Sequence, residues 1–205
     1  RAINLLGLKG VCITTHSDGK YPGDDAYRPL YKKIAELDVP IFVHAAPLMV
    51  GHEFLSQDKV TNTMVYSFGR AIDHSLAIIR LLGSGILKDF PTLKFINGHI
   101  GGVWAYMSTR LLNPSNPIWD TGVNPSEGLG QLYFDIAPSR WEQPQITCAT
   151  ALLGADHLLF GSDFPSTDPR ALVVNQKLVN GLDIPAEDKE KIFSGNAIKL
   201  FKIKM

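Results

Sequence analysis

The chain has 205 residues, of which 45% are hydrophobic and 20% charged, a composition typical of a globular domain. Lys plus Arg and Asp plus Glu number 20 each, so the formal net charge is zero, and no excess of positive charge favours nucleic acid or an anionic membrane surface. No apolar run approaches the roughly 20 residues that a transmembrane helix needs. Cys12 and Cys148 lie in apolar stretches and indicate buried free thiols of an intracellular protein. We therefore expect a cytoplasmic protein whose partners are neither nucleic acid nor a membrane.

Short apolar stretches predict β-strands at five places along the chain. None of them alternates cleanly between apolar and polar residues, so we expect strands that are buried on both faces, as in a parallel sheet. Segments with helical spacing lie between these stretches or after the last of them. The predicted strands are residues 9–15, 39–45, 93–99, 131–137 and 157–163, and the predicted helical segments are residues 24–38, 72–91, 143–156 and 186–203.

Strands that alternate with helices predict βαβ units and an α/β fold. No linker, repeat or low-complexity tract divides the chain, so we interpret residues 1–205 as a single domain. The connections at 45–71 and 113–130 are longer than most loops of compact domains, and long loops of this kind are often functional.

Three polar residues stand at the carboxyl ends of predicted strands: His44, His99 and Asp163. Active sites of parallel α/β proteins gather at that end, and imidazole and carboxylate groups are the ligands that zinc and related ions prefer. Taken alone, either histidine is better explained as a hydrogen-bonded structural residue, and Asp163 as a helix N-cap or an Asx-turn residue. Capping does not explain why two histidines share the same position, and we therefore favour a common site.

The remaining histidines give weaker signals. His16 follows the first predicted strand and is a candidate pocket residue. His52 in a loop and His74 in a helix are interpreted as surface or packing residues. His157 stands at the start of a strand, on the wrong side of the sheet for the site.

The segment "NGHIGG" at 97–102 contains two consecutive glycines. Gly101 and Gly102 let the backbone turn sharply and approach a ligand closely. The spacing is not that of a dinucleotide-binding or P-loop motif, so phosphate binding is weakly supported.

Five segments then occur in a familiar order: "PIFVHAAP", "SGILKDFPTLKFINGHIGG", "YFDIA", "LLFGSDFP" and "IFSGNAIKLF". Together they resemble the aminocarboxymuconate semialdehyde decarboxylase-like branch of the amidohydrolase superfamily. This resemblance implies a (β/α)8 TIM barrel with one divalent metal, most commonly zinc. It also implies that the protein is a homodimer.

The resemblance assigns roles to individual residues. His44 would be the metal ligand on the fifth strand and Asp163 the ligand on the eighth, where it also takes part in catalysis. His99 would be the acid–base histidine. Arg110 resembles an arginine that these decarboxylases lend across the dimer interface to a substrate carboxylate, with a solvated helix-face residue as the alternative. His16 is a weaker candidate for substrate binding.

By this mapping residues 9–15 are the fourth barrel strand, so the chain supplies strands four to eight of a barrel that typically needs about 250 residues. The resemblance also implies an H-x-H pair of metal ligands on the first strand. That pair is not in this sequence, because no two of its histidines stand two residues apart. Five strands without the other three would leave a sheet edge and much of the barrel interior exposed.

The leading functional hypothesis is a metal-dependent decarboxylase of a small aromatic or unsaturated carboxylic acid, which works by a metal-bound water and His99 as acid and base. One alternative is a metal-dependent hydrolase of an amide, lactone or C–C bond on the same scaffold. A further alternative is a truncated, non-catalytic half-barrel that serves as an interaction module. A nucleotide-binding doubly wound sheet has the least support, since its glycine fingerprint is missing.

Overall fold

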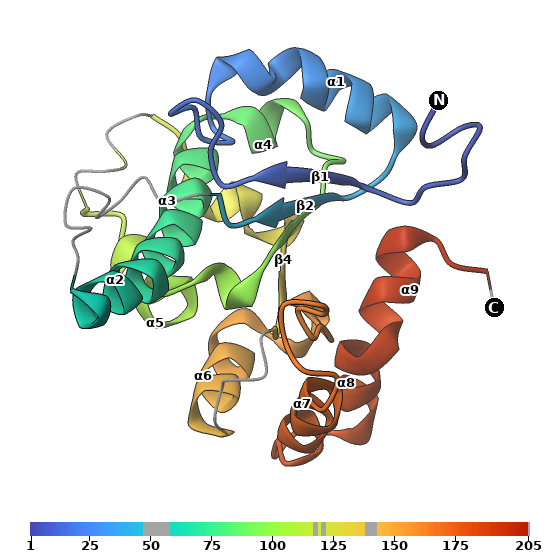
Figure 1. Ribbon diagram of the computed structural model, residues 1–205. Helices are drawn as coiled ribbons and strands as arrows, with labels where there is room; N and C mark the ends of the chain where they lie inside the picture. The colour runs from blue at the N-terminus through green and yellow to red at the C-terminus, as the bar shows by residue number, and fades with distance from the viewer. Residues whose placement is uncertain (47–57, 117–118, 120–121, 138–142, 205) are drawn as a thin grey trace.

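The protein is described by a computed structural model that covers residues 1–46, 58–116, 119, 122–137 and 143–204. Its centre is one parallel five-stranded sheet in the order β1-β2-β3-β4-β5, in which each strand pairs with the next one along the chain (Figure 1). Thr14 lies opposite His44, and Val43 lies opposite Asn97. The strands are β1 (Val11–Thr14), β2 (Ile41–His44), β3 (Phe95–Asn97), β4 (Leu132–Asp135) and β5 (Leu158–Leu159). All five predicted strands are confirmed, each shorter than expected.

Helices connect successive strands and follow the last one. The α-helices are α1 (Arg28–Leu37), α2 (Lys59–Met64), α3 (Arg70–Gly83), α4 (Ile86–Asp89), α5 (Trp104–Leu111), α6 (Gln143–Leu153), α7 (Ala171–Asn180), α8 (Ala186–Glu190) and α9 (Asn196–Phe201). The 3-10 turns are η1 (Asp25–Tyr27), η4 (His99–Gly101), η6 (Pro125–Gln131) and η7 (Ala155–His157), and the π-helical turns are η3 (Val65–Gly69) and η8 (Lys191–Gly195).

The four predicted helical segments are confirmed, and Gly85 separates α3 from α4 with a φ of +77°. The prediction that 45–71 is a loop is wrong from residue 59 onward, because α2, η3 and α3 form one continuous helical run over 59–83. The β-branched and polar residues of 59–63 have low helix propensity. Their helix is set by its context: the Asp58 carboxylate caps it by accepting the N–H groups of Val60 and Thr61, and α3 continues it. Helix α7 was not predicted.

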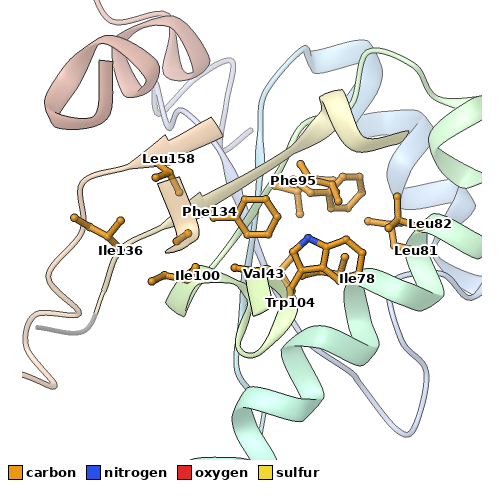
Figure 2. Close-up of a cluster of buried hydrophobic side chains, with 14 of the residues drawn as sticks. Val43, Ile78, Leu81, Leu82, Phe95, Ile100, Trp104, Phe134, Ile136 and Leu158 are labelled. Carbon is orange, nitrogen blue, oxygen red and sulfur yellow. The ribbon is translucent and has the colours of Figure 1, made fainter. Parts of the chain in front are cut away.

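The main hydrophobic core lies between the sheet and the helices that follow its strands, from α1 to α7. Phe95 and Phe134 of the sheet meet Ile78 of α3 and Trp104 of α5 there (Figure 2). Trp104 is only 1% exposed. Full burial of each large apolar side chain contributes about 1.5–3 kcal/mol, so this face is what holds the sheet in place.

The opposite face of the sheet is covered less completely. A smaller cluster joins Ile96 and Leu159 of the sheet to Leu200 of α9. Both ends of the chain lie at the right of Figure 1, beyond the amino ends of β1 and β2. Toward the carboxyl ends, Thr14 and His44 are exposed, so the prediction of strands buried on both faces is wrong for β1 and β2. Five strands form an open arc, which cannot enclose its own inner face as a closed barrel does.

The structure also gives the positions of the two cysteines. Both are free, but Cys12 of β1 is exposed and Cys148 is half-buried, so the expected burial of the thiols is wrong. None of the helices in the described part of the chain is both long and apolar enough to cross a membrane.

Candidate metal and acid–base site

His44, His99 and Asp163 come together at the carboxyl ends of the strands. One potential ligand atom from each lies within 4.8 Å of the others. His44 is the last residue of β2, whereas His99 lies two residues beyond β3 and Asp163 four residues beyond β5. The expectation that strands run as far as His99 and Asp163 is wrong, since both residues have positive φ, +55° and +60°. An extended strand cannot continue through that conformation.

The donor set suits a divalent ion. Two imidazoles and one carboxylate are borderline ligands of the kind that zinc, manganese and iron accept. Ligand atoms that share a zinc ion lie roughly 3–4 Å from one another. The three ligand atoms here would have to move roughly 1 Å closer together to bind one ion. His44 is exposed and the other two are half-buried, so the group is open to solvent on one side.

His99 is held in a fixed orientation. Its Nδ1 lies 3.1 Å from the backbone oxygen of Ala137, and its ring meets the His44 ring edge-on at a centroid distance of 5.8 Å. When Nδ1–H donates to that oxygen, the lone pair of the neutral ring lies on Nε2. His99 is therefore equipped to bind a metal or to take up a proton through Nε2.

Asp135, the last residue of β4, is a site residue that the sequence reasoning missed. Its Oδ1 accepts the backbone N–H of His99 at 2.8 Å and that of Ala137 at 3.1 Å. Burial raises the pKa of this carboxyl to about 6, the two N–H groups and His99 oppose that rise, and Asp163 adds to it. Asp135 thus fixes the turn that carries His99. The signal was available in "YFDIA", where an aspartate ends a strand as Asp163 was expected to do.

The turn after His99 is packed against α3. Gly102 has a φ of +72°, and a Cβ on it would lie 1.9 Å from the backbone oxygen of Ala71. The Ser75 hydroxyl oxygen lies 3.0 Å from the Gly101 oxygen and accepts the N–H of Val103. The close approach that these glycines permit is therefore to a helix. The expected approach to a ligand remains a prediction, although Gly102 also borders the cleft described below.

His74 of α3 belongs to the surroundings of the site. It is 1% exposed, and its ring meets that of His99 edge-on at 5.4 Å. Neither ring nitrogen has a hydrogen-bond partner among the described residues. Burial in the first place, and then His99 and His44, lower the pKa of His74 to about 3, so it is neutral. The packing role expected for His74 is confirmed, and a surface position is wrong.

His16 lies in a different cluster. Its Nε2 is 3.4 Å from Oδ2 of the buried Asp73, whose Oδ1 accepts the Tyr21 hydroxyl at 2.7 Å. His16 does not border the cleft that contains His99 and Asp163.

Asp163 does not cap helix α7. Helix α7 begins eight residues later, and its N-cap position is Arg170. The carboxylate that forms an Asx turn in this segment is that of Asp168, which accepts the Arg170 N–H at 2.8 Å. Within the described part of the chain no hydrogen bond reaches the Asp163 carboxylate, so that group is available to a ligand.

A cleft of about 520 Å³ opens beside these residues. One wall is the helical run 59–83, another is the segment from Asp163 to Thr167, and His99 and His74 lie between them. The lining residues are Thr63, Tyr66, Ser67, Arg70, Ala71, His74, His99, Gly102, Asp163, Ser166 and Thr167.

The other predicted residues lie apart from the cleft. Arg110 is exposed on the last turn of α5 and does not line the cleft of its own chain. His157 precedes β5 as expected, with its Nδ1 2.6 Å from the Leu132 oxygen. His52 lies outside the described residues.

Comparisons with known proteins identify the family of the chain. Residues 1–203 match the family described as Amidohydrolase. The decarboxylase OrsB of Emericella nidulans is 26% identical over all of this chain and 65% of its own length, and 6-methylsalicylic acid decarboxylase of Penicillium expansum is 27% identical over 96% and 64%. The 2-amino-3-carboxymuconate-6-semialdehyde decarboxylase of Dictyostelium discoideum is 24% identical over 97% of this chain and 55% of its own length.

A solved structure has the same fold. Dihydroxybenzoic acid decarboxylase from Polaromonas, crystallised with manganese and the inhibitor 2-nitroresorcinol, superposes with a TM-score of 0.79 at 22% identity. The match covers 98% of this chain and 63% of that one, so this chain spans less than two thirds of that structure and of the decarboxylase OrsB. The five-stranded parallel sheet is therefore part of a TIM-barrel fold, and the chain belongs to the amidohydrolase family, with relatives over its whole length in the branch of aminocarboxymuconate semialdehyde decarboxylase.

Proposed function

We propose that residues 1–205 form one domain that provides strands four to eight of a (β/α)8 barrel, and that the complete barrel is a metal-dependent decarboxylase of a small aromatic carboxylic acid. The observation that carries this proposal is the convergence of His44, His99 and Asp163 within 4.8 Å at the carboxyl ends of three strands. Decarboxylases are among the relatives that match nearly the entire chain. The first three strands, with any ligands they carry, would come from outside this sequence.

His44 and Asp163 would hold the metal. A bound divalent ion supplies a Lewis acid that polarises a substrate oxygen. Zinc and manganese both suit these ligands, and the Polaromonas relative contains manganese. The open side of the group, where His44 is exposed, leaves room for ligands from the rest of the barrel.

His99 would move the proton of the reaction. In non-oxidative decarboxylation a proton adds to the substrate carbon that bears the carboxylate. The bond from that carbon to the carboxylate carbon then breaks, its electron pair stays with the substrate, and carbon dioxide leaves. The Ala137 oxygen holds Nδ1 and Asp135 holds the backbone N–H, so Nε2 is the atom left to deliver or accept this proton.

Arg110 would act outside its own cleft. Its exposed position on α5 is compatible with reaching the substrate carboxylate of a second copy, as the resemblance to the decarboxylases implies. We therefore include a homodimer in the proposal.

The test uses the complete protein and a matched pair of variants in the same segment, Asp163→Ala and Asp168→Ala. Metal content would be measured by elemental analysis, and carbon dioxide release would be assayed with 2,6-dihydroxybenzoate and 6-methylsalicylate. We expect about one metal per chain and carbon dioxide release in the wild type and in Asp168→Ala, and loss of both in Asp163→Ala.

Metal retained in Asp163→Ala would overturn the ligand assignment. Normal metal content with hydrolysis of an ester or amide, and no carbon dioxide from any acid, would identify a hydrolase instead. Absence of metal from the complete protein would favour a non-catalytic barrel.

A further inference from the structure

One wall of the cleft is a single helical stripe. Six of the eleven lining residues come from the run 59–83, at positions 63, 66, 67, 70, 71 and 74. These intervals of three and four residues place side chains on one face of a helix. The cleft therefore has a continuous helical wall, and none of the side chains of this wall is a candidate metal ligand.

Arg70 is the notable member of this stripe. It is the only Arg or Lys side chain among the described residues that line the cleft, and Asp163 is the only carboxylate. Arg70 is exposed, and within the described part of the chain no ion pair or hydrogen bond occupies its guanidinium. Its guanidinium carbon lies 5.5 Å from the ring centroid of Tyr66.

A cation–π contact of this kind restrains an arginine without using its hydrogen-bond donors. The guanidinium lies over the ring, and its N–H groups remain able to bind a carboxylate in a bidentate manner. A lysine has no planar fork of donors, and an arginine without the ring would have to be immobilised when the ligand binds. Tyr66 thus gives the cleft a partly ordered receptor for a planar anion.

We infer that Arg70, oriented by Tyr66, binds the carboxylate of the substrate within the cleft of its own chain. This inference rests on the proposed function and adds the recognition of the acid group to it. The cation on the helical wall and the ligand group at Asp163 border the same cleft, so one small aromatic acid can contact both. Arg110 lies elsewhere and would be a separate contact contributed by a neighbouring chain.

The same helix offers a matched control. Arg80 of α3 is also exposed and also lies over a tyrosine ring, with its guanidinium carbon 4.8 Å from the Tyr21 ring centroid. It borders a different pocket, together with Asp24 and Asp25. Substitution of either arginine removes one cation–π contact from α3, but only Arg70 borders the cleft with His99 and Asp163.

The experiment measures binding by calorimetry for the complete protein and its Arg70→Gln and Arg80→Gln variants. The probes are 2,6-dihydroxybenzoate and the uncharged 2,6-dihydroxybenzamide. Loss of a charge-assisted bidentate contact increases the dissociation constant by about 10- to 100-fold. We expect this loss for the acid in Arg70→Gln, less than about a twofold change for the amide, and no change for either probe in Arg80→Gln. Equal metal content and thermal unfolding in the three proteins would exclude misfolding.

Each other outcome has a defined meaning. Unchanged acid binding in Arg70→Gln would overturn the inference and leave the proposed function standing. Equal weakening for acid and amide would place another substrate group at Arg70 and would also overturn it. Failure of the wild type to bind either probe would instead contradict an aromatic acid as the substrate. Tyr66→Phe should bind the acid normally and Tyr66→Leu more weakly, since only the latter loses the aromatic face.

Discussion

At the amino end of β5, Asn196 donates two hydrogen bonds to backbone oxygens, at 2.8 Å to Ala155 and 2.7 Å to Leu158. Gln131 does the same at the start of β4, where its Nε2 reaches the oxygens of Phe90 and Leu93. At the carboxyl end, the carboxylate of Asp163 has no such partner among the described residues.

The two ends of the sheet thus use polar side chains differently. Those at the amino end satisfy buried backbone groups, which stabilises the fold. At the carboxyl end Asp135 also bonds to backbone N–H groups, whereas the Asp163 carboxylate has no hydrogen bond among the described residues, and we expect it to serve a ligand, as at the catalytic face of barrel proteins. Substitutions at the two ends should therefore separate activity from stability.

The largest expected effect concerns activity at the carboxyl end. His99→Ala should lower the decarboxylation rate of the complete protein by about 10²- to 10⁴-fold, the usual contribution of an acid–base residue. Metal binding through His44 and Asp163 should persist in part. The unfolding midpoint should fall only modestly, because the Asp135 bond to the backbone of residue 99 stays and only the side-chain contact with the Ala137 oxygen is lost. Rates, metal content and thermal unfolding would be measured together. An unchanged rate at normal metal content would rule out the acid–base role.

The next effect concerns stability at the amino end. Asn196→Ala leaves the oxygens of Ala155 and Leu158 without their donor, and we expect it to lower the free energy of unfolding by roughly 2–4 kcal/mol. The activity per folded molecule should stay normal. Asn180→Ala, at an exposed position that ends α7, is the control and should cost less than about 0.5 kcal/mol. Urea unfolding measures both. Equal costs for the two variants would contradict the structural role of Asn196.

Asp135 combines the two kinds of role and yields a pH dependence. Its pKa is about 6 in the folded protein and 3.8 in the absence of burial. Between pH 4 and pH 6 the unfolded chain therefore loses a proton that the folded chain keeps, so the stability contributed by this group falls as the pH rises. The fall amounts to at most roughly 3 kcal/mol and is complete above the folded pKa.

Asp135→Asn should remove that fall, because the amide does not titrate and its oxygen can still accept the His99 N–H. Urea unfolding of both proteins at pH 4, 5, 6 and 7, after removal of metal, measures the difference in slope. Parallel curves for the two proteins would mean that Asp135 does not titrate in this range.

Much of the fold could be predicted because the signals are local. Apolar runs that end at His44 or begin after His157 mark strands, and their order with the helices allows little besides a parallel sheet. The neighbourhood of His44, His99 and Asp163 followed from the same topology, since parallel strands bring their carboxyl ends to one rim.

The rest depends on contacts between distant segments. The helix over 59–69 has weak propensity and exists as an extension of α3, so neither Tyr66 nor Arg70 was visible as part of a wall. The burial of Asp135 and His74 depends on how the sheet and α3 pack against the turn at Gly102. The local sequence around these residues does not indicate that packing.

The π-helical turn η3 has a consequence for how such a wall can change. A π turn holds about one residue more than an α turn, so deletion of one residue within 65–69 would turn it into a regular α turn and leave the preceding helix and α3 on nearly their present faces. Thr63, Arg70 and His74 would then still face the cleft. A change of one residue in length could thus alter the middle of the cleft wall without moving a candidate metal ligand.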